Sequence, residues 1–193
     1  MNKVIVTSLM VLFSIAAPLA FAQDSVEVQQ KKLQDVVDHV TWKNLNIDFF
    51  DVKDKAQNGY KAMTVKSIDN KNGLTFYVAP KPVLNLQDTR SMDVSYNPGD
   101  GDNLRLMVRF NPDGKKSLFD YSSAHINEMM GVVVDGKLRL VANLRRPLTN
   151  GRIQVYGFSA NEAIGILQRY YQPKIEAARK FNEQFSSTKL PQK

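Results

Sequence analysis

The clearest pattern in this chain is a strict alternation of apolar and polar positions at residues 104–110. Apolar side chains stand two residues apart, and the intervening positions include two arginines: Leu104, Leu106, Val108 and Phe110 against Arg105, Met107 and Arg109. Because successive side chains of a strand point to opposite faces, this pattern predicts a half-buried strand. Shorter runs of the same kind complete the set of predicted strands: 47–52, 60–68, 74–78, 92–96, 104–110, 131–134, 137–142 and 152–156.

Apolar residues spaced three and four apart predict the helices. The first begins at Asp24–Ser25, whose side chains can cap it, and ends near Trp42. Pro112 opens a second helix, and a third covers about 160–171. Pro173 starts or kinks a last amphipathic helix, and the polar tail after Phe185 is expected to be disordered.

These elements predict an α+β fold. We expect one antiparallel sheet of about five strands with helices packed on one face, plus an N-terminal helix and strand extension. A break with two prolines at 79–82 marks the start of the main domain. The expected parts are the extension at 23–80, the α+β domain at 81–172, and a C-terminal helix and tail at 173–193. Whether 23–80 is a second small domain or part of the same sheet stays open.

Helices on one face leave the other face of the sheet open. If the apolar residues of the strands point at the helices, alternation puts the following side chains on the opposite face: Arg105, Met107, Arg109, Arg139, Val141, Arg152, Gln154 and Tyr156. Guanidinium groups both pair with carboxylates and stack on apolar surfaces, so this face suits an extended polypeptide or an anionic partner. The alternative is a solvated face, or one covered by the N-terminal extension.

A run of turn and cap signals lies between 131 and 163. Asp135-Gly136 between two apolar stretches predicts a hairpin with a type I′ turn, because both residues tolerate positive φ. A loop follows at 146–151 (RPLTNG). The next strand ends in Gly-Phe-Ser before a helix that carries Glu162 and Ala163.

The order and spacing of these motifs resemble the head subdomain of the first periplasmic domain of SecD, an accessory subunit of the bacterial Sec translocon. The resemblance covers about 104–168, and the matching positions are Phe110, Gly114, Phe119, Gly131, Asp135, Gly136, Pro147, Leu148, Thr149, Gly151, Gly157, Phe158, Ser159, Glu162 and Ala163. The chain departs from the family pattern at Leu140–Ala142, where Ser-Ala-Pro is usual, and at Arg146, where an acidic residue is usual. These departures change side chains of that strand and leave the fold intact.

The resemblance implies a role near protein export or envelope biogenesis. The motor role of SecD does not transfer, because it needs a membrane part that we do not expect in this chain.

The first 22 residues are typical of a secretory signal peptide. Lys3 precedes an apolar run from Val4 to Ala20, and Ala20-Phe21-Ala22 is a small-x-small cleavage site. Cleavage would lower the formal net charge from +7 to +6, because Lys3 is the only charged residue removed (25 Lys and Arg then face 19 Asp and Glu). The sequence contains no cysteine. We expect a basic periplasmic protein without stable membrane insertion.

Candidate catalytic and metal-binding residues are few. The two histidines, His39 and His125, fall in predicted helices outside any nucleophile or zinc pattern. Asp35 and His39 would share one helix face, which is more often a solvated stripe. A calcium loop that starts at Asp100 would need glutamate where Asn111 stands. We therefore expect no enzyme activity, no metal and no cofactor.

The leading hypothesis is a periplasmic, non-catalytic protein that binds unfolded or partner polypeptides in protein export or envelope biogenesis. Binding would use the basic face or the loop 143–151. The alternative is an envelope-surface module that binds anionic glycan or lipid head groups. In a third hypothesis, the amphipathic helix at 174–185 docks on another protein. Nucleic acid is not expected, because the stacking aromatic residues are too few. The ligand and the oligomeric state do not follow from the sequence.

Overall fold

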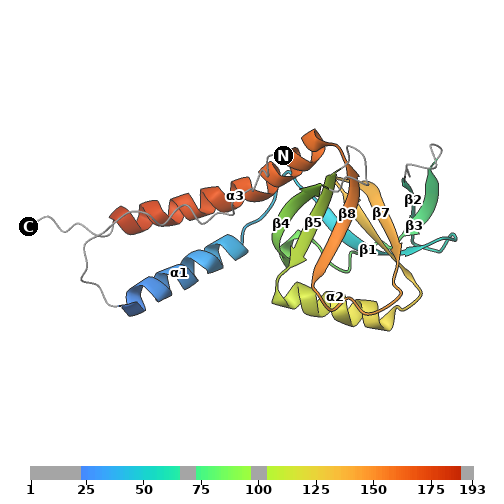
Figure 1. Ribbon diagram of the computed structural model, residues 1–193, viewed down its shortest axis with the longest axis horizontal. Coiled ribbons are helices and arrows are strands. Elements are labelled where there is room, and N and C mark those ends of the chain that lie inside the picture. Colours follow the sequence, from blue (N-terminus) through green and yellow to red (C-terminus); the bar gives the residue numbers. More distant parts are fainter. Residues whose placement is uncertain (1–22, 66–72, 97–103, 188–193) are drawn as a thin grey trace, which may run out of the picture.

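A computed structural model describes residues 23–65, 73–96 and 104–187 of the chain (Figure 1). The elements follow in this order: α1 (Gln23–Asp38), β1 (Ile47–Lys53), β2 (Lys61–Val65), β3 (Leu74–Val78), η1 (Leu86–Asp88), β4 (Thr89–Tyr96), β5 (Leu104–Phe110), α2 (Pro112–Ala124), β6 (Met129–Val134), β7 (Lys137–Asn143), β8 (Arg152–Phe158) and α3 (Ala160–Ser187). The predicted signal peptide at 1–22, the end of the strand predicted at 60–68, the start of the considered calcium loop at Asp100 and the last six residues lie outside the described residues.

The strands form two antiparallel sheets. One has five strands in the order β2-β3-β1-β6-β7, and the other has three in the order β4-β5-β8. The predicted α+β class is confirmed, but strands that the sequence analysis placed in one sheet are divided between two. β1 pairs with β6 from Ile47 opposite Val134 to Val52 opposite Met129. The segment 23–80 therefore supplies β1, β2 and β3 to the same sheet as β6 and β7.

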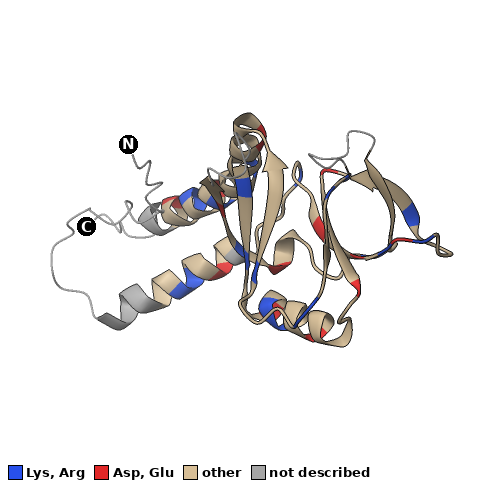
Figure 2. Cartoon of the chain, turned by 45° about the vertical axis from the view of Figure 1, so that its right-hand side comes forward, with Lys and Arg blue, Asp and Glu red and all other residues tan. Residues whose placement is uncertain are grey.

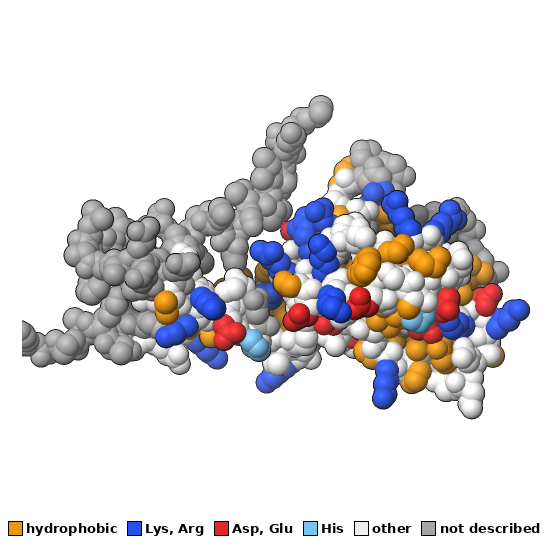
Figure 3. Space-filling model, turned by 90° about the horizontal axis from the view of Figure 1, so that it is seen from below, with side chains coloured by type: hydrophobic (Ala, Val, Ile, Leu, Met, Phe, Trp, Pro, Cys, Tyr) orange, Lys and Arg blue, Asp and Glu red, His pale blue; other side chains and the backbone are white. Residues whose placement is uncertain are grey.

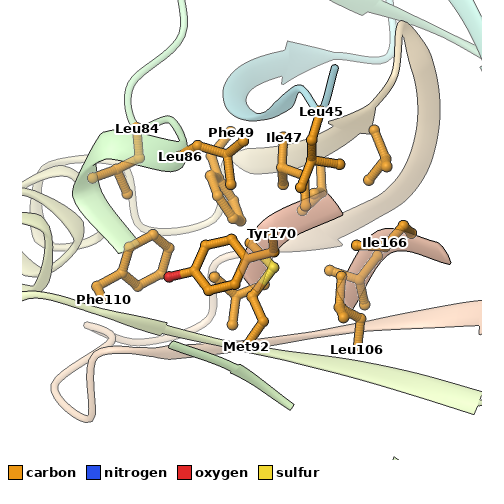
Figure 4. Close-up of a cluster of buried hydrophobic side chains, with 14 of the residues drawn as sticks. Leu45, Ile47, Phe49, Leu84, Leu86, Met92, Leu106, Phe110, Ile166 and Tyr170 are labelled. Carbon is orange, nitrogen blue, oxygen red and sulfur yellow. The ribbon is translucent and has the colours of Figure 1, made fainter. Parts of the chain in front are cut away.

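The main core lies between the two sheets (Figure 4). β1 contributes Ile47 and Phe49, and the facing sheet contributes Met92 and Leu106, all fully or almost fully buried. The first half of α3 adds its own buried side chains to this core, with Tyr170 the largest of them. Each such side chain contributes about 1.5–3 kcal/mol through burial, so α3 is an integral part of the core.

A second, smaller cluster forms where the five-stranded sheet curls and brings β2 beside β7 (Figure 2). Its buried residues are Val52, Val78, Val133 and Leu138. Gly131 allows this packing, because a Cβ atom there would lie 2.5 Å from Cγ2 of Val52. The curl therefore depends on a position without a side chain.

The two longest helices, α1 and α3, lie side by side and extend away from the sheets (Figure 1). The predicted start of a separate helix at Pro173 is wrong, because α3 continues through Pro173 as one helix. α1 ends at Asp38 rather than near Trp42. The Trp42 ring instead stacks on the ring of Tyr170 at 5.3 Å, and its Nε1–H donates to the Tyr170 carbonyl oxygen at 2.9 Å. This pair joins the segment after α1 to α3.

Candidate functional site

The face of the β4-β5-β8 sheet that points away from the core corresponds to most of the predicted basic surface. We call it the outer face; its residues are Ser91, Asp93, Ser95, Arg105, Met107, Arg109, Arg152, Gln154 and Tyr156. Buried Met92, Leu106, Val108 and Val155 alternate with them, and this fixes the direction in which they point. No described helix lies in front of β5 and β8 in Figure 1.

Three contacts order the side chains of the outer face. Arg109 forms an ion pair with Asp93 of the neighbouring strand, and the two side chains are 43% and 49% exposed. The guanidinium carbon of Arg105 lies 4.9 Å from the centroid of the Tyr156 ring. The Tyr156 hydroxyl donates to Oε1 of Gln154 at 3.0 Å. An ion pair at this exposure contributes only about 0–1 kcal/mol, so the surface can rearrange at little cost.

A β-bulge puts Tyr156 on this surface. Leu104 pairs with Phe158 and Leu106 pairs with Val155, so two residues of β8 stand opposite one residue of β5. Gly157 has a φ of +83°, a conformation that glycine adopts far more easily than other residues. The bulge lets Val155 and Phe158 both point into the core while Tyr156 stays outside.

Arg139 and Val141 do not belong to the outer face, so this part of the predicted surface is wrong. Both residues lie on β7, in the five-stranded sheet. A bulge in the pairing of β7 with β6 breaks the alternation, and Leu138 and Leu140 pack against different clusters. Val141 packs against the second cluster, while Nη2 of Arg139 donates to Oε1 of Glu162 at 2.7 Å. The predicted group therefore reduces to six residues on β5 and β8.

The loop 144–151 precedes β8 and is held in place by α2 and β5. Oγ of buried Ser122 accepts the backbone N–H of Leu148 at 2.8 Å. The carbonyl oxygen of Gly151 accepts the backbone N–H of Phe110 at 3.0 Å. Because backbone groups at its middle and end are bonded, the loop presents a fixed surface.

This loop and α2 line a cavity of about 460 Å³. Phe119 of α2 forms one wall, and residues 146–150 form the other. Phe119 is 41% exposed, so part of its side chain is accessible at the cavity. Figure 3 shows the side of the molecule on which α2 lies, where hydrophobic side chains gather among charged ones. Arg146 supplies positive charge at the cavity where the family pattern has an acidic residue.

Side chains of α3 form hydrogen bonds with backbone groups of β4, at the edge of the three-stranded sheet. The Tyr171 hydroxyl donates to the carbonyl oxygen of Met92 at 2.7 Å and accepts the N–H of Met92 at 3.3 Å. Nζ of buried Lys174 donates to the carbonyl oxygen of Arg90 at 3.2 Å. A strand added here would need these same groups, so α3 blocks strand addition at this part of β4.

The titratable groups nearest to a catalytic arrangement lie at the end of β1. The Asp51 carboxylate accepts the hydroxyls of Tyr60 at 2.6 Å and Tyr121 at 3.2 Å, and Nζ of Lys53 lies 3.2 Å from it and 2.5 Å from Glu128. Burial alone would raise the pKa of Asp51, but the hydrogen bonds from Tyr60 and Lys53 outweigh it and hold the pKa below its usual value. Burial, aided by the charge of Asp51, raises the pKa of Tyr121 far above its usual value. The charges and hydrogen-bonding groups of these residues pair with one another, as in a cluster that stabilises the fold.

Within the described residues, no group of three or more His, Asp and Glu side chains could hold a metal ion. No helix in the described ranges is long and apolar enough to cross a membrane.

A family model described as "SecDF, P1 head subdomain" matches residues 60–166, which is more than half of the chain. The chain belongs to the SecDF P1 head subdomain family. The matched range starts inside the stretch that the sequence analysis treated as an extension, which agrees with the position of β2 and β3 in the five-stranded sheet. No curated protein matches the sequence.

Two solved structures share the fold of this P1 head protein. One, described as "Structure and function of a membrane component SecDF that enhances protein export", is 15% identical with a TM-score of 0.50, over 80% of this chain and 71% of that chain. The other, described as "Crystal structure of SecDF in Super-membrane-facing form", is 16% identical with a TM-score of 0.50, over 78% of this chain and 21% of that chain. At these identities the likeness shows the fold alone.

The structure explains why several motif positions of the P1 head family carry the residues they do. Asp135 and Gly136 have φ values of +48° and +75°, as the predicted type I′ turn requires. Ser159 and Glu162 form a capping box at the start of α3: Oγ of Ser159 accepts the Glu162 N–H at 3.3 Å, and Oε2 of Glu162 accepts the Ser159 N–H at 3.1 Å. Ala163 is fully buried in the core.

Ser91, Asp93 and Ser95 of the outer face and Phe119 of the cavity were missing from the predicted site. Asp93 alternates with Met92 and Val94 in the sequence, so its face could have been inferred, but its position beside Arg109 depends on strand register. Phe119 stood in the sequence analysis only as a match to the family pattern, without a place on the surface. The loop 144–151 leaves it partly exposed beside the cavity.

Proposed function

We propose that this P1 head protein is a non-catalytic binding protein that works in protein export in the periplasm. Its ligand in this proposal is an extended, unfolded segment of another polypeptide. The observation that carries the proposal is the outer face, where arginines alternate with apolar and aromatic side chains on an exposed sheet. Two points support the setting: membership in the SecDF P1 head family, and a sequence that begins like a secretory signal peptide.

The chemistry of the outer face fits a polypeptide of mixed composition. Arg105 and Arg152 can pair with carboxylates, while the Met107 side chain is flexible and adapts to different apolar partners. Tyr156 offers a ring face or edge and a hydroxyl. Because the Arg109–Asp93 pair is exposed, it can open to admit a charged partner of either sign. Such a surface favours many weak contacts over one exact fit.

The cavity beside Phe119 extends this surface toward α2. The loop 144–151 runs directly into Arg152, the first residue of β8. A segment that crosses the outer face could therefore continue along the loop and place one apolar side chain in the cavity. Arg146 would favour a segment with an acidic residue next to that side chain.

The alternative function is binding of anionic glycans or lipid head groups, and the specific observation in its favour is the basic excess on the outer face, where three arginines face one aspartate. Purely charge-driven binding should collapse as salt rises from low to moderate concentration, because exposed charges are screened within about 10 Å at 0.1 M. Polypeptide binding that also uses Met107 and Tyr156 should persist.

The experiment measures affinity for a permanently unfolded protein, reduced and carboxymethylated α-lactalbumin. Reversal of two facing charges, Arg109→Glu with Arg152→Glu, should weaken binding about tenfold or more at 0.15 M salt. The control reverses two exposed lysines elsewhere, Lys61→Glu with Lys180→Glu, and should leave the affinity unchanged although the net charge falls equally. Equal weakening by both pairs would mean that only net charge matters, and no weakening would place the site elsewhere.

A further inference from the structure

A second cavity, away from the outer face, has a chemistry of its own. It measures about 290 Å³ and lies between the segment that leads from α1 into β1 and the short helix η1. Besides two leucines, its lining consists of Trp42, Asn46, Asp48, Asn85 and Gln87. Cavities for small ligands usually have about 300–1,000 Å³, so this one is suited to a single side chain rather than a large molecule.

Asp48 is the one charged residue in this lining. No described lysine or arginine forms an ion pair with it, although the chain has an excess of basic residues. Burial raises the pKa of Asp48, and a hydrogen bond with Asn46 acts in the opposite direction. A partly buried carboxylate without a cation is costly, and a cation in the cavity would offset that cost.

Three of the other polar residues of the cavity are held by contacts within the protein. The Trp42 ring is held by its stack on Tyr170 and by the Nε1 hydrogen bond. The Asn85 side chain caps η1 by accepting the Gln87 N–H at 2.8 Å, and the Gln87 side chain reaches the carbonyl oxygen of Val40 at 3.4 Å. Ordered walls reduce the entropy that a ligand must overcome on binding.

We propose that this cavity binds the cationic end of a lysine or arginine side chain, with Asp48 as its counter-ion and the amide oxygens of the walls as further acceptors. The Trp42 ring already stacks on Tyr170 and has Nζ of Lys174 5.6 Å from its centroid, so its contribution to the ligand is packing against the aliphatic stem. This proposal rests on the proposed function only in one respect: the bound side chain would come from an exported polypeptide that carries basic residues. The cavity would let the protein hold a basic residue while the outer face holds acidic and apolar ones.

The test uses the one tryptophan of the chain as its reporter, since Trp42 lines the cavity. The full-length mature chain is titrated with N-acetyl-lysine methylamide and, separately, with N-acetyl-norleucine methylamide, which keeps most of the side-chain length and lacks the charge. Added sodium chloride keeps the ionic strength equal. We expect a saturable change in Trp42 fluorescence with the lysine compound and at least tenfold weaker binding of the norleucine compound.

Two variants locate the effect. Asp48→Asn, nearly the same shape without the charge, should weaken binding of the lysine compound about tenfold, whereas Asp54→Asn on the exposed turn after β1 should leave it unchanged. Circular dichroism checks that both fold. Absence of saturation in the unmodified chain, or equal affinities of the chain and Asp48→Asn, overturns the proposal. Binding of N-acetylglucosamine in place of the lysine compound also overturns it and marks a sugar site.

Failure of this site and failure of the proposed function are separable. The Arg109→Glu and Arg152→Glu pair should abolish tight binding of unfolded α-lactalbumin and leave the lysine titration unchanged. Binding of the lysine compound without any binding of unfolded protein would refute the proposed function and support the proposal for the cavity.

Discussion

The hydroxyl group of Tyr171 bonds both backbone groups of Met92, donating to the carbonyl oxygen at 2.7 Å and accepting the N–H at 3.3 Å. A helix side chain thus replaces the missing neighbour of an edge strand. Removal of this one oxygen by Tyr171→Phe should lower the free energy of unfolding by about 1 kcal/mol, because two edge groups lose their partner. Urea unfolding checks this value.

The same variant should also associate with itself more readily, because an open strand edge is a template for pairing. Tyr96→Phe is the control, since Tyr96 is 60% exposed on the same strand and should change neither quantity. Unchanged stability and unchanged self-association in Tyr171→Phe would show that the edge is protected in another way.

The Asp51 cluster predicts a loss of stability in acid. The pKa of Asp51 in the folded chain lies below its usual value of 3.8, so its ionised form stabilises the fold. That contribution is fully present above pH 3.8 and is lost as the pH falls through the folded pKa. Asp51→Asn should therefore cost about 1–3 kcal/mol near neutral pH, and less below about pH 3.8.

Chemical denaturation of both proteins between pH 7 and pH 3 measures this difference, with Asp54→Asn as the exposed control. A difference that does not depend on pH would mean that shape, rather than the charge of Asp51, accounts for the effect.

The bulge at Gly157 predicts a position-specific effect of alanine. A Cβ atom at Gly157 would have no other atom within 4 Å, so Gly157→Ala causes no clash. The φ of +83° at this position should nevertheless lower the free energy of unfolding of the variant by about 1–2 kcal/mol. Gly165→Ala also meets no atom within 4 Å, but it lies inside α3 and should stabilise the protein by about 0.5–1 kcal/mol. Thermal unfolding of the two variants checks the opposite signs. The same sign for both would contradict the account of the bulge.

The cavity between α2 and the loop predicts a loss of binding without a loss of fold. Phe119→Ala removes an aromatic side chain that is 41% exposed, so stability should change little. Affinity for unfolded α-lactalbumin should fall several-fold, because the wall of the cavity is lost. Ile164→Ala, at a 51% exposed position on α3, is the matched control and should bind as the unmodified chain does. Equal affinities of all three proteins would show that the cavity does not contribute to binding of the unfolded protein.

Local patterns predicted most of the elements but not their partners. Strict alternation in β5 and the Asp135-Gly136 turn each have a local cause, and the structure confirms both. The pairing of β1 with β6 joins residues more than 75 positions apart, and no local signal specifies such a pair. This is why the sequence analysis merged two sheets into one.

Sheet membership and bulges decide where the prediction of the surface succeeded and where it failed. Alternation predicted Tyr156 correctly, because the bulge comes just after it at Gly157. The same rule failed for Arg139 and Val141, because β7 belongs to the five-stranded sheet and a bulge in its pairing with β6 also breaks the alternation. Of the two alternatives predicted for Pro173, the start of a new helix is wrong. Tyr170 and Lys174 on either side of it are buried, and this packing keeps α3 continuous where an isolated helix would tend to break.

The most direct test of the central claim is site-specific crosslinking to a defined unfolded protein. A photo-reactive residue replaces Tyr156 on the outer face or, as the control, Lys180 on the exposed side of α3, and each protein is irradiated with reduced, carboxymethylated α-lactalbumin. Binding through the outer face predicts strong crosslinking from position 156, little from position 180, and competition by unlabelled unfolded protein. Equal yields from both positions, or none from position 156, would contradict binding of unfolded polypeptide at the outer face.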